Sequence, residues 1–212
     1  MKYLLLDVAG TLLHKPSFYK KIQAMLKSEG YDIDEKTIKY HHKILSESFH
    51  FPDRTNELFY KSFNRELLYS FGIIPSDIQL ERIFKECSYL PWEKFEDVQF
   101  LREIELPIGI ISNFNSTLKE KLQMQFDLKI SDIFVSEELG VAKPSLEFYQ
   151  QALNIINIEP SEIIYIGDSV KLDLEPARKL GINTFLIDRE NFFPSQKYRI
   201  NSFSELKNLI SK

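Results

Sequence analysis

Five short runs of apolar residues stand out along the chain, each bounded by polar or turn-forming residues. They lie at residues 3–6, 108–111, 133–135, 163–166 and 184–187. Runs of this length without polar alternation are typical of strands buried on both faces, as in a parallel sheet covered by helices. The pattern therefore predicts five strands of one parallel sheet.

The stretches between the later runs have the apolar spacing of helices. Helices are predicted at 116–124, 145–156 and 173–180, where apolar residues recur at three- and four-residue intervals. Ser145 is a residue typical of a helix N-cap, and Gly181 is typical of the position just past a helix end. Alternation of strands and helices predicts an α/β fold with a right-handed, doubly wound parallel sheet.

The interval between the first two predicted strands is too long for the strand–helix alternation seen later in the chain. Residues 8–107 separate the first two runs, whereas a strand–helix–strand unit takes about 30 residues. Within the interval, segments of helical period predict helices at 17–29, 34–49, 55–71 and 77–87. We therefore expect a helical domain at 17–90 inserted into a core formed by 1–16 and 91–212, with joints near Pro16 and Pro91.

Composition and charge narrow the classes of protein. The chain has 212 residues, 43% hydrophobic and 27% charged, with 27 Lys and Arg against 31 Asp and Glu and a net charge of −4. This balance gives no basic footprint for nucleic acid or for an anionic membrane. A single cysteine excludes an internal disulfide, and no apolar run approaches the roughly 18 residues of a membrane span. Asp7 comes too early for a signal peptide, so we expect a soluble, cytoplasmic protein.

Polar residues follow the ends of the predicted strands. They are Asp7 after the first, Ser112 after the second, Lys143 after the third and Asp168 after the fourth. Ligands of open parallel sheets bind beyond the carboxyl ends of the strands, so these side chains are expected to converge. Two carboxylates there suit one Mg²⁺ bound together with a substrate phosphate, and a lysine and a hydroxyl suit phosphoryl oxygens.

At these residues the chain resembles the haloacid dehalogenase superfamily. Four of its motifs occur in order: Asp-x-x-Gly-Thr at 7–11, Ser112, Lys143-Pro144, and Gly-Asp-Ser-x-x-x-Asp at 167–173. The segment Ile-Ser-Asn-Phe-Asn at 111–115 is similar to the phosphatase-like branch with a helical cap. The inserted helical domain looks like the superfamily's type 1 cap.

The resemblance implies a Mg²⁺-dependent hydrolase that dephosphorylates a small phosphorylated metabolite through an aspartyl-phosphate on Asp7. Mg²⁺ would be held by the Asp7 carboxylate, the backbone carbonyl of Ala9 and Asp168. Lys143 would offset developing negative charge, and Asp173 would orient Lys143 or a metal-bound water. The residues expected to contact the phosphate or support its loop are Thr11, Ser112, Asn113 and Lys143.

Ala9 departs from the phosphatase pattern, which has a second aspartate two residues after the nucleophile. In the family that carboxyl protonates the leaving oxygen and later activates water, and such catalysis contributes typically 10²–10⁴-fold. A methyl group transfers no proton. His14 is a candidate replacement because an ordinary histidine has a pKa near neutrality, although a solvated loop histidine is the commoner role.

Three other functions stay open at this point. Ala9 motivates a catalytically weak, phosphate-binding or regulatory module. The form Asp-x-Ala-Gly-Thr resembles phosphonoacetaldehyde hydrolases, but neither Lys39 nor Lys43 lies in a recognisable lysine motif, and Lys143 stands where that subfamily has an arginine. A 2-haloacid dehalogenase also lacks the second aspartate, but it replaces the metal-binding acid that is retained here as Asp168.

Substrate selectivity is expected to depend on the inserted domain. Its phenylalanine-rich helices are more often core than substrate cage, and Cys87 is expected to be a buried or half-buried side chain rather than a nucleophile. The segment at 50–52 is a candidate lining of a cleft between cap and core.

Overall fold

The computed structural model describes residues 1–49 and 55–210, so the predicted cleft lining at 50–52 lies outside the described residues. The chain divides into two compact units, one formed by Met1–His14 with Lys94–Lys212 and the other by Lys15–Glu93. These divisions lie close to the expected joints at 16/17 and 90/91. We call the first the α/β unit and the second the helical unit.

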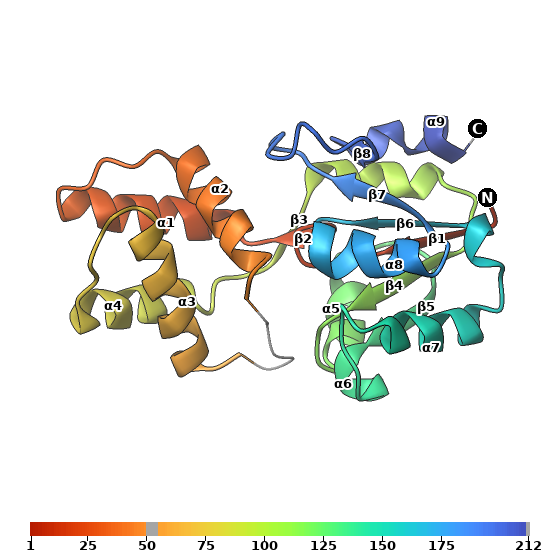
Figure 1. The fold of residues 1–212 in the computed structure, drawn as a ribbon, viewed down its shortest axis with the longest axis horizontal. Coiled ribbons are helices and arrows are strands. Elements are labelled where there is room, and N and C mark those ends of the chain that lie inside the picture. Colours follow the sequence, from red (N-terminus) through yellow and green to blue (C-terminus); the bar gives the residue numbers. More distant parts are fainter. Residues whose placement is uncertain (50–54, 211–212) are drawn as a thin grey trace. The chain divides into compact units, whose positions relative to one another are not determined.

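A six-stranded parallel sheet forms the centre of the α/β unit (Figure 1). Its spatial order is β5-β4-β1-β6-β7-β8, and every pairing is parallel. The strands are β1 (Tyr3–Leu6), β4 (Ile108–Ser112), β5 (Ile130–Val135), β6 (Ile163–Gly167), β7 (Asn183–Ile187) and β8 (Arg199–Ile200). The predicted fold class is confirmed, as are the five predicted strands. The two-residue strand β8 carries no apolar run and was not predicted.

The order of the strands marks one edge of the sheet as the candidate site. The chain builds outward from β1 through β4 to β5, then returns to pair β6 against the other side of β1. This reversal between β1 and β6 is a topological switch point, the place where open α/β sheets usually bind their ligands. All residues of β1, β4 and β6 are buried, which explains their unbroken apolar runs.

Helices cover the sheet. The α-helices of this unit are α5 (Leu118–Gln125), α6 (Ser136–Leu139), α7 (Leu146–Ile156), α8 (Glu175–Lys179) and α9 (Leu206–Ile210). Tyr149 of α7 and Ala177 of α8 share one apolar cluster with Leu5 and Tyr165 of the sheet. The other helical segments are the 3₁₀-helices η1 (Glu96–Glu103), η2 (Pro160–Glu162) and η4 (Phe203–Glu205) and the π-helical turn η3 (Val170–Leu174).

One predicted helix begins differently in the structure. The helix expected over 173–180 is preceded by the π-helical turn η3 and continues as α8. The Ser169 hydroxyl accepts a hydrogen bond from the backbone N–H of Leu172, while the Asp173 side chain folds back onto the Ser169 N–H. These side-chain contacts open the first turn, and apolar periodicity carries no signal for them.

The helical unit contains the four predicted helices, α1 (Pro16–Ser28), α2 (Glu35–Ser46), α3 (Glu57–Ser70) and α4 (Asp77–Cys87). Side-chain caps begin three of them: Asp34 for α2, Asn56 for α3 and Ser76 for α4. Their apolar faces form one core, in which Cys87 is buried as expected. Two short strands, β2 (Leu13–His14) and β3 (Glu93–Lys94), pair where the chain passes between the two units.

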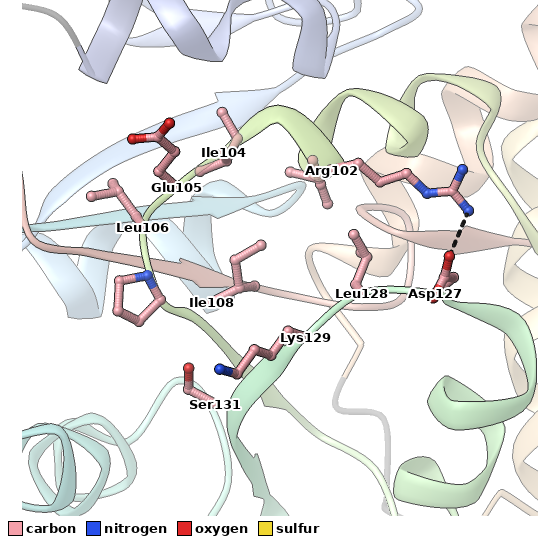
Figure 2. A pocket seen from close by; sticks show the side chains of 11 residues that line it. Arg102, Ile104, Glu105, Leu106, Ile108, Asp127, Leu128, Lys129 and Ser131 are labelled. Atoms are coloured by element: carbon pink, nitrogen blue, oxygen red, sulfur yellow. Dashed lines mark ion pairs between the residues drawn. The ribbon is translucent and has the colours of Figure 1, made fainter.

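A groove of about 450 Å³ lies at the amino ends of β4 and β5 (Figure 2). Its lining mixes apolar and charged side chains, and Arg102 and Asp127 form an ion pair of 3.6 Å there. Ile108 begins β4 at this groove, whereas Ser112 ends the strand, so the groove and the predicted site lie at opposite edges of the sheet. No helix among the described residues has the length and apolarity needed to cross a membrane.

Candidate active site

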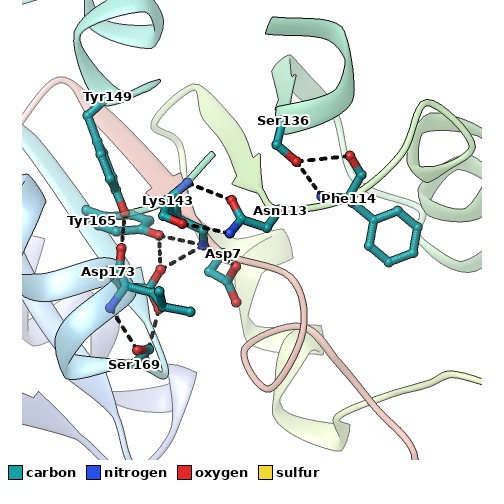
Figure 3. Close-up of polar contacts among 10 residues, drawn as sticks. Asp7, Asn113, Phe114, Ser136, Lys143, Tyr149, Tyr165, Ser169 and Asp173 are labelled. Atoms are coloured by element: carbon teal, nitrogen blue, oxygen red, sulfur yellow. Dashed lines mark hydrogen bonds and ion pairs between the residues drawn. The ribbon is translucent and has the colours of Figure 1, made fainter. Parts of the chain in front are cut away.

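Three carboxylates lie close together at the carboxyl edge of the sheet, where the sequence analysis expected two, those of Asp7 and Asp168. Asp7 follows β1, Asp168 follows β6 and Asp173 lies on η3, and their nearest oxygens lie within 4.8 Å of one another. Ser112 ends β4 and is buried. Lys143 reaches the same place from the loop that precedes α7 (Figure 3).

Lys143 joins two of the acids. Its Nζ donates to Asp7 Oδ1 at 2.6 Å, to Asp173 Oδ1 at 2.7 Å and to the hydroxyl of Tyr165 at 3.3 Å (Figure 3). The lysine is 3% exposed. Burial opposes its charge, but the carboxylates of Asp173 and Asp7 outweigh burial and hold the pKa of Lys143 above its usual range. The ammonium is therefore a permanent positive charge beside Asp7.

Asp173 is fixed from three sides. Its Oδ1 accepts the Tyr165 hydroxyl at 2.6 Å as well as Lys143, and its Oδ2 accepts the backbone N–H of Ser169 at 2.9 Å. Gly167 makes room for it, because a Cβ at that position would lie 2.4 Å from the Asp173 carboxylate. Tyr165 was not among the predicted site residues. The one feature of the sequence that could have identified Tyr165 is that its hydroxyl lies within an otherwise apolar strand.

The two oxygens of Asp7 have different surroundings. Oδ1 accepts the hydrogen bond from Lys143, whereas Oδ2 is buried and has no hydrogen-bond partner within the described chain. The pKa of Asp7 is raised to about 7: burial is the largest cause, Lys143 acts in the opposite direction, and Asp173 and Asp168 add to the rise. Three acids around one lysine leave an excess of negative charge. A buried, unpartnered carboxylate oxygen in such a cluster fits a divalent cation.

The loop after β1 passes close to Asp168. Gly10 has a φ of +87°, and a Cβ there would lie 2.2 Å from Asp168 Oδ2, so only glycine fits. Thr11 is fully buried, and its hydroxyl has no partner among the described residues. Ala9 lies between them and Asp7 with its side chain exposed.

Asn113 holds the backbone of Lys143. Its Nδ2 donates to the Lys143 carbonyl at 2.9 Å, and its Oδ1 accepts the Lys143 N–H at 2.7 Å (Figure 3). The sequence interpretation gave Asn113 a contact with the phosphate or its loop, and the structure shows its amide engaged with the lysine. The His14 ring, predicted as a candidate proton donor, stacks on Phe95 with centroids 3.9 Å apart.

Comparisons with known proteins agree with this geometry. The family model described as haloacid dehalogenase-like hydrolase matches residues 1–181. A glyceraldehyde 3-phosphate phosphatase of Methanocaldococcus jannaschii is 32% identical over 118 residues, covering 52% of this chain and 51% of that protein. The (S)-2-haloacid dehalogenase 4A of Burkholderia cepacia is 28% identical over 141 residues, covering 63% and 60%. The matches thus span about half to three fifths of these relatives.

A solved structure shares the fold along the whole chain. The HAD-hydrolase YfnB of Bacillus subtilis, determined bound to magnesium, superposes with a TM-score of 0.67 at 19% identity, covering 100% of this chain and 99% of that one. At this identity the likeness shows the fold alone.

Proposed function

This chain belongs to the haloacid dehalogenase-like hydrolases, and we propose that it is a Mg²⁺-dependent phosphohydrolase acting on a small phosphorylated metabolite. One observation carries the proposal. Among the described residues, Asp7 has one oxygen held by a buried lysine and the other buried without a partner, and an oxygen of Asp168 lies within 4.8 Å in the same cluster. The helical unit is proposed to act as a type 1 cap that supplies substrate selectivity.

The residues present fit a bound Mg²⁺. We assign it the Asp7 carboxylate, the backbone carbonyl of Ala9 and Asp168. Mg²⁺ demands oxygen ligands and is usually held by one or two carboxylates together with substrate phosphate, which matches this donor set. When bound, it supplies positive charge against the oxygens of the phosphoryl group.

Asp7 is assigned the nucleophile. One of its carboxylate oxygens attacks phosphorus, the bond from phosphorus to the leaving oxygen breaks, and an aspartyl-phosphate forms. Water then attacks the same phosphorus, the bond to Asp7 breaks, and inorganic phosphate leaves with the carboxylate regenerated. Lys143 keeps Asp7 in place and offsets charge on the phosphoryl oxygens, while Ser112 and Thr11 offer hydroxyl donors to them.

Proton transfer is where this site is weakest. The leaving oxygen must gain a proton in the first step, and the attacking water must lose one in the second. Ala9 provides neither transfer. Its side chain is exposed, so the protons are assigned to solvent, with His14 as the candidate side chain. We expect slow turnover of alkyl phosphates and faster turnover of substrates whose leaving oxygen needs no proton.

Ala9 also favours a second candidate, a phosphate-binding module with little turnover. A 2-haloacid dehalogenase, which is the activity named for the Burkholderia cepacia relative, is disfavoured because such enzymes replace the metal-binding acid that is retained here as Asp168. Without a metal, a carboxylate substrate would meet three acids and one lysine. The phosphonoacetaldehyde hydrolase alternative needs a lysine that forms a Schiff base, and neither Lys39 nor Lys43 lies in a motif that indicates this role. Lys39 forms an ion pair with Glu35, and Lys43 forms one with Glu47.

Phosphate release tests these functions together. The panel is p-nitrophenyl phosphate, glyceraldehyde 3-phosphate, other phosphometabolites and phosphonoacetaldehyde, each with Mg²⁺ and with chelator, beside halide release from 2-chloropropionate. We expect Mg²⁺-dependent phosphate release that Asp7→Asn abolishes. Halide release, or phosphate release retained by Asp7→Asn, would overturn the proposal. If folded, Mg²⁺-binding protein releases neither phosphate nor halide, the phosphate-binding module is favoured.

A further inference from the structure

Arg189 contacts the loop that carries Asp7. It lies two residues past the end of β7, and its guanidinium donates from Nη1 to the carbonyl oxygen of Gly10 at 3.3 Å and from Nη2 to that of Thr11 at 3.0 Å. One side chain therefore fixes two consecutive peptide groups of the loop from outside the four motifs.

The guanidinium is itself held rigidly. Asp97 accepts from Nε at 3.1 and 3.2 Å and from Nη2 at 2.8 Å, a bidentate pairing that sets the plane of the group. The ring of Phe95 lies 3.8 Å from its central carbon, and the ring of Phe203 lies 5.3 Å away. Asp97 is anchored in turn by the backbone N–H of Phe203 at 3.0 Å. The arginine thus acts as a fixed brace.

The braced peptides lie against the acidic cluster. Gly10 lies directly against Asp168, because a Cβ at this position would be only 2.2 Å from its Oδ2, so this part of the loop borders the acidic cluster. Outward movement would carry the Ala9 carbonyl away from Asp7 and Asp168, the groups to which Mg²⁺ is assigned. The hydrogen bonds from Arg189 to the carbonyl oxygens of two consecutive residues, Gly10 and Thr11, oppose that movement.

We propose that Arg189 is a positioning residue that sets the Mg²⁺ affinity of the site by fixing the Gly10 and Thr11 carbonyls, with Asp97 fixing Arg189. It acts through the loop and contacts neither substrate nor metal. The inference rests on the proposed function in one respect, the assignment of Mg²⁺ to Asp7, Ala9 and Asp168.

The test is titration calorimetry of Mg²⁺ into metal-free protein, which needs no turnover. Arg189→Met keeps the aliphatic stem and removes the donors. The matched control is Arg178→Met, because the Arg178 guanidinium likewise lies on an aromatic ring, Tyr198 at 4.7 Å, and donates to a backbone carbonyl, that of Thr184 at 3.3 Å. We expect Arg189→Met to weaken Mg²⁺ binding at least fivefold and Arg178→Met to leave it within twofold of the original.

Two further variants, one with a matched control, distinguish a specific loss of Mg²⁺ affinity from a general disturbance of the structure. Asp97→Asn keeps an acceptor for Arg189 and should weaken binding less than Arg189→Met. In Arg189→Ala, millimolar guanidinium should restore Mg²⁺ affinity. Arg178→Ala should bind Mg²⁺ without added guanidinium. Unchanged binding in Arg189→Met, or equal loss in Arg178→Met, would overturn the inference. If the original protein binds Mg²⁺ but releases no phosphate, the proposed function fails while this test still decides the role of Arg189.

Discussion

Asp7 and Lys143 form a buried ion pair at the carboxyl edge of the sheet. The positive charge of Lys143 offsets the negative charges of two buried carboxylates. Its Nζ lies 2.6 Å from Asp7 Oδ1 and 2.7 Å from Asp173 Oδ1. Removing one partner of a buried ionic group leaves the others uncompensated in a poorly solvated place. The stability of the metal-free protein therefore depends on this lysine.

We predict that Lys143→Met lowers the free energy of unfolding by about 3–5 kcal/mol, the usual loss for a broken buried pair. Urea unfolding in chelator measures it. Lys119→Met, which breaks an exposed ion pair to Glu138, should cost no more than about 1 kcal/mol. Equal losses in the two variants would mean that Asp7 and Asp173 are compensated in some other way.

Ala9 is the position at which the proposed function predicts that a carboxyl group would add general acid–base catalysis. Its side chain is exposed on the loop after Asp7, so a carboxyl there needs no buried space and meets solvent. We predict that Ala9→Asp raises Mg²⁺-dependent phosphate release from alkyl phosphates at least about tenfold, near the lower bound for general acid–base catalysis. Ala9→Asn is the matched control, with similar volume and no titratable proton. An unchanged rate in Ala9→Asp would assign proton transfer to another group such as His14.

At the scale of elements, the strands could be predicted from the sequence because apolar periodicity marks them. Features that depend on individual side-chain contacts could not. The apolar runs of β1, β4 and β6 mark the sheet, and the motif order places Asp7, Lys143 and Asp168 at one edge. The turn η3 could not be predicted, because it depends on the Ser169 and Asp173 side chains. Arg189 lacks a signal for a different reason: its contacts with Gly10 and Thr11 span almost the whole chain.

The helical unit contains a pH-sensitive element. His42 of α2 packs edge-on against Phe18 and Tyr19 of α1 and Phe63 of α3, with centroids 5.0–5.4 Å away. Burial, with a smaller contribution from Lys43, lowers the pKa of His42 from 6.5 to about 4. The folded chain therefore excludes a proton that the unfolded chain binds below pH 6.5.

Stability should consequently fall as the pH drops from about 6.5 to 4 and be unaffected by His42 above that window. The loss is at most about 3 kcal/mol, and smaller to the extent that water reaches the half-buried ring. Urea unfolding at a series of pH values measures it. His42→Phe should flatten this dependence, whereas His41→Phe, whose parent ring lies beside Ser70 and Phe71, should keep it. Retention of the full dependence by His42→Phe would refute the assignment.

At the scale of the whole molecule, the sheet order gathers negative charge at one place in a chain whose net charge is only −4. The switch between β1 and β6 brings Asp7 and Asp168 together, and η3 adds Asp173. The folded chain keeps these acids adjacent, whereas the unfolded chain separates them. A divalent cation should therefore bind the folded state selectively and shift the folding equilibrium.

We predict that Mg²⁺ raises the melting temperature of the protein, with a gain in unfolding free energy of about 2.7 kcal/mol at one hundred times the dissociation constant. Differential scanning calorimetry with Mg²⁺ and with chelator measures it. Asp168→Asn should abolish the shift because it removes a proposed ligand and one negative charge. Asp132→Asn should keep it, since Asp132 accepts the Tyr3 hydroxyl at 2.6 Å and is no member of the cluster. A full shift in Asp168→Asn would place the cation elsewhere on the molecule, and the hydrolase proposal would then lose its metal site.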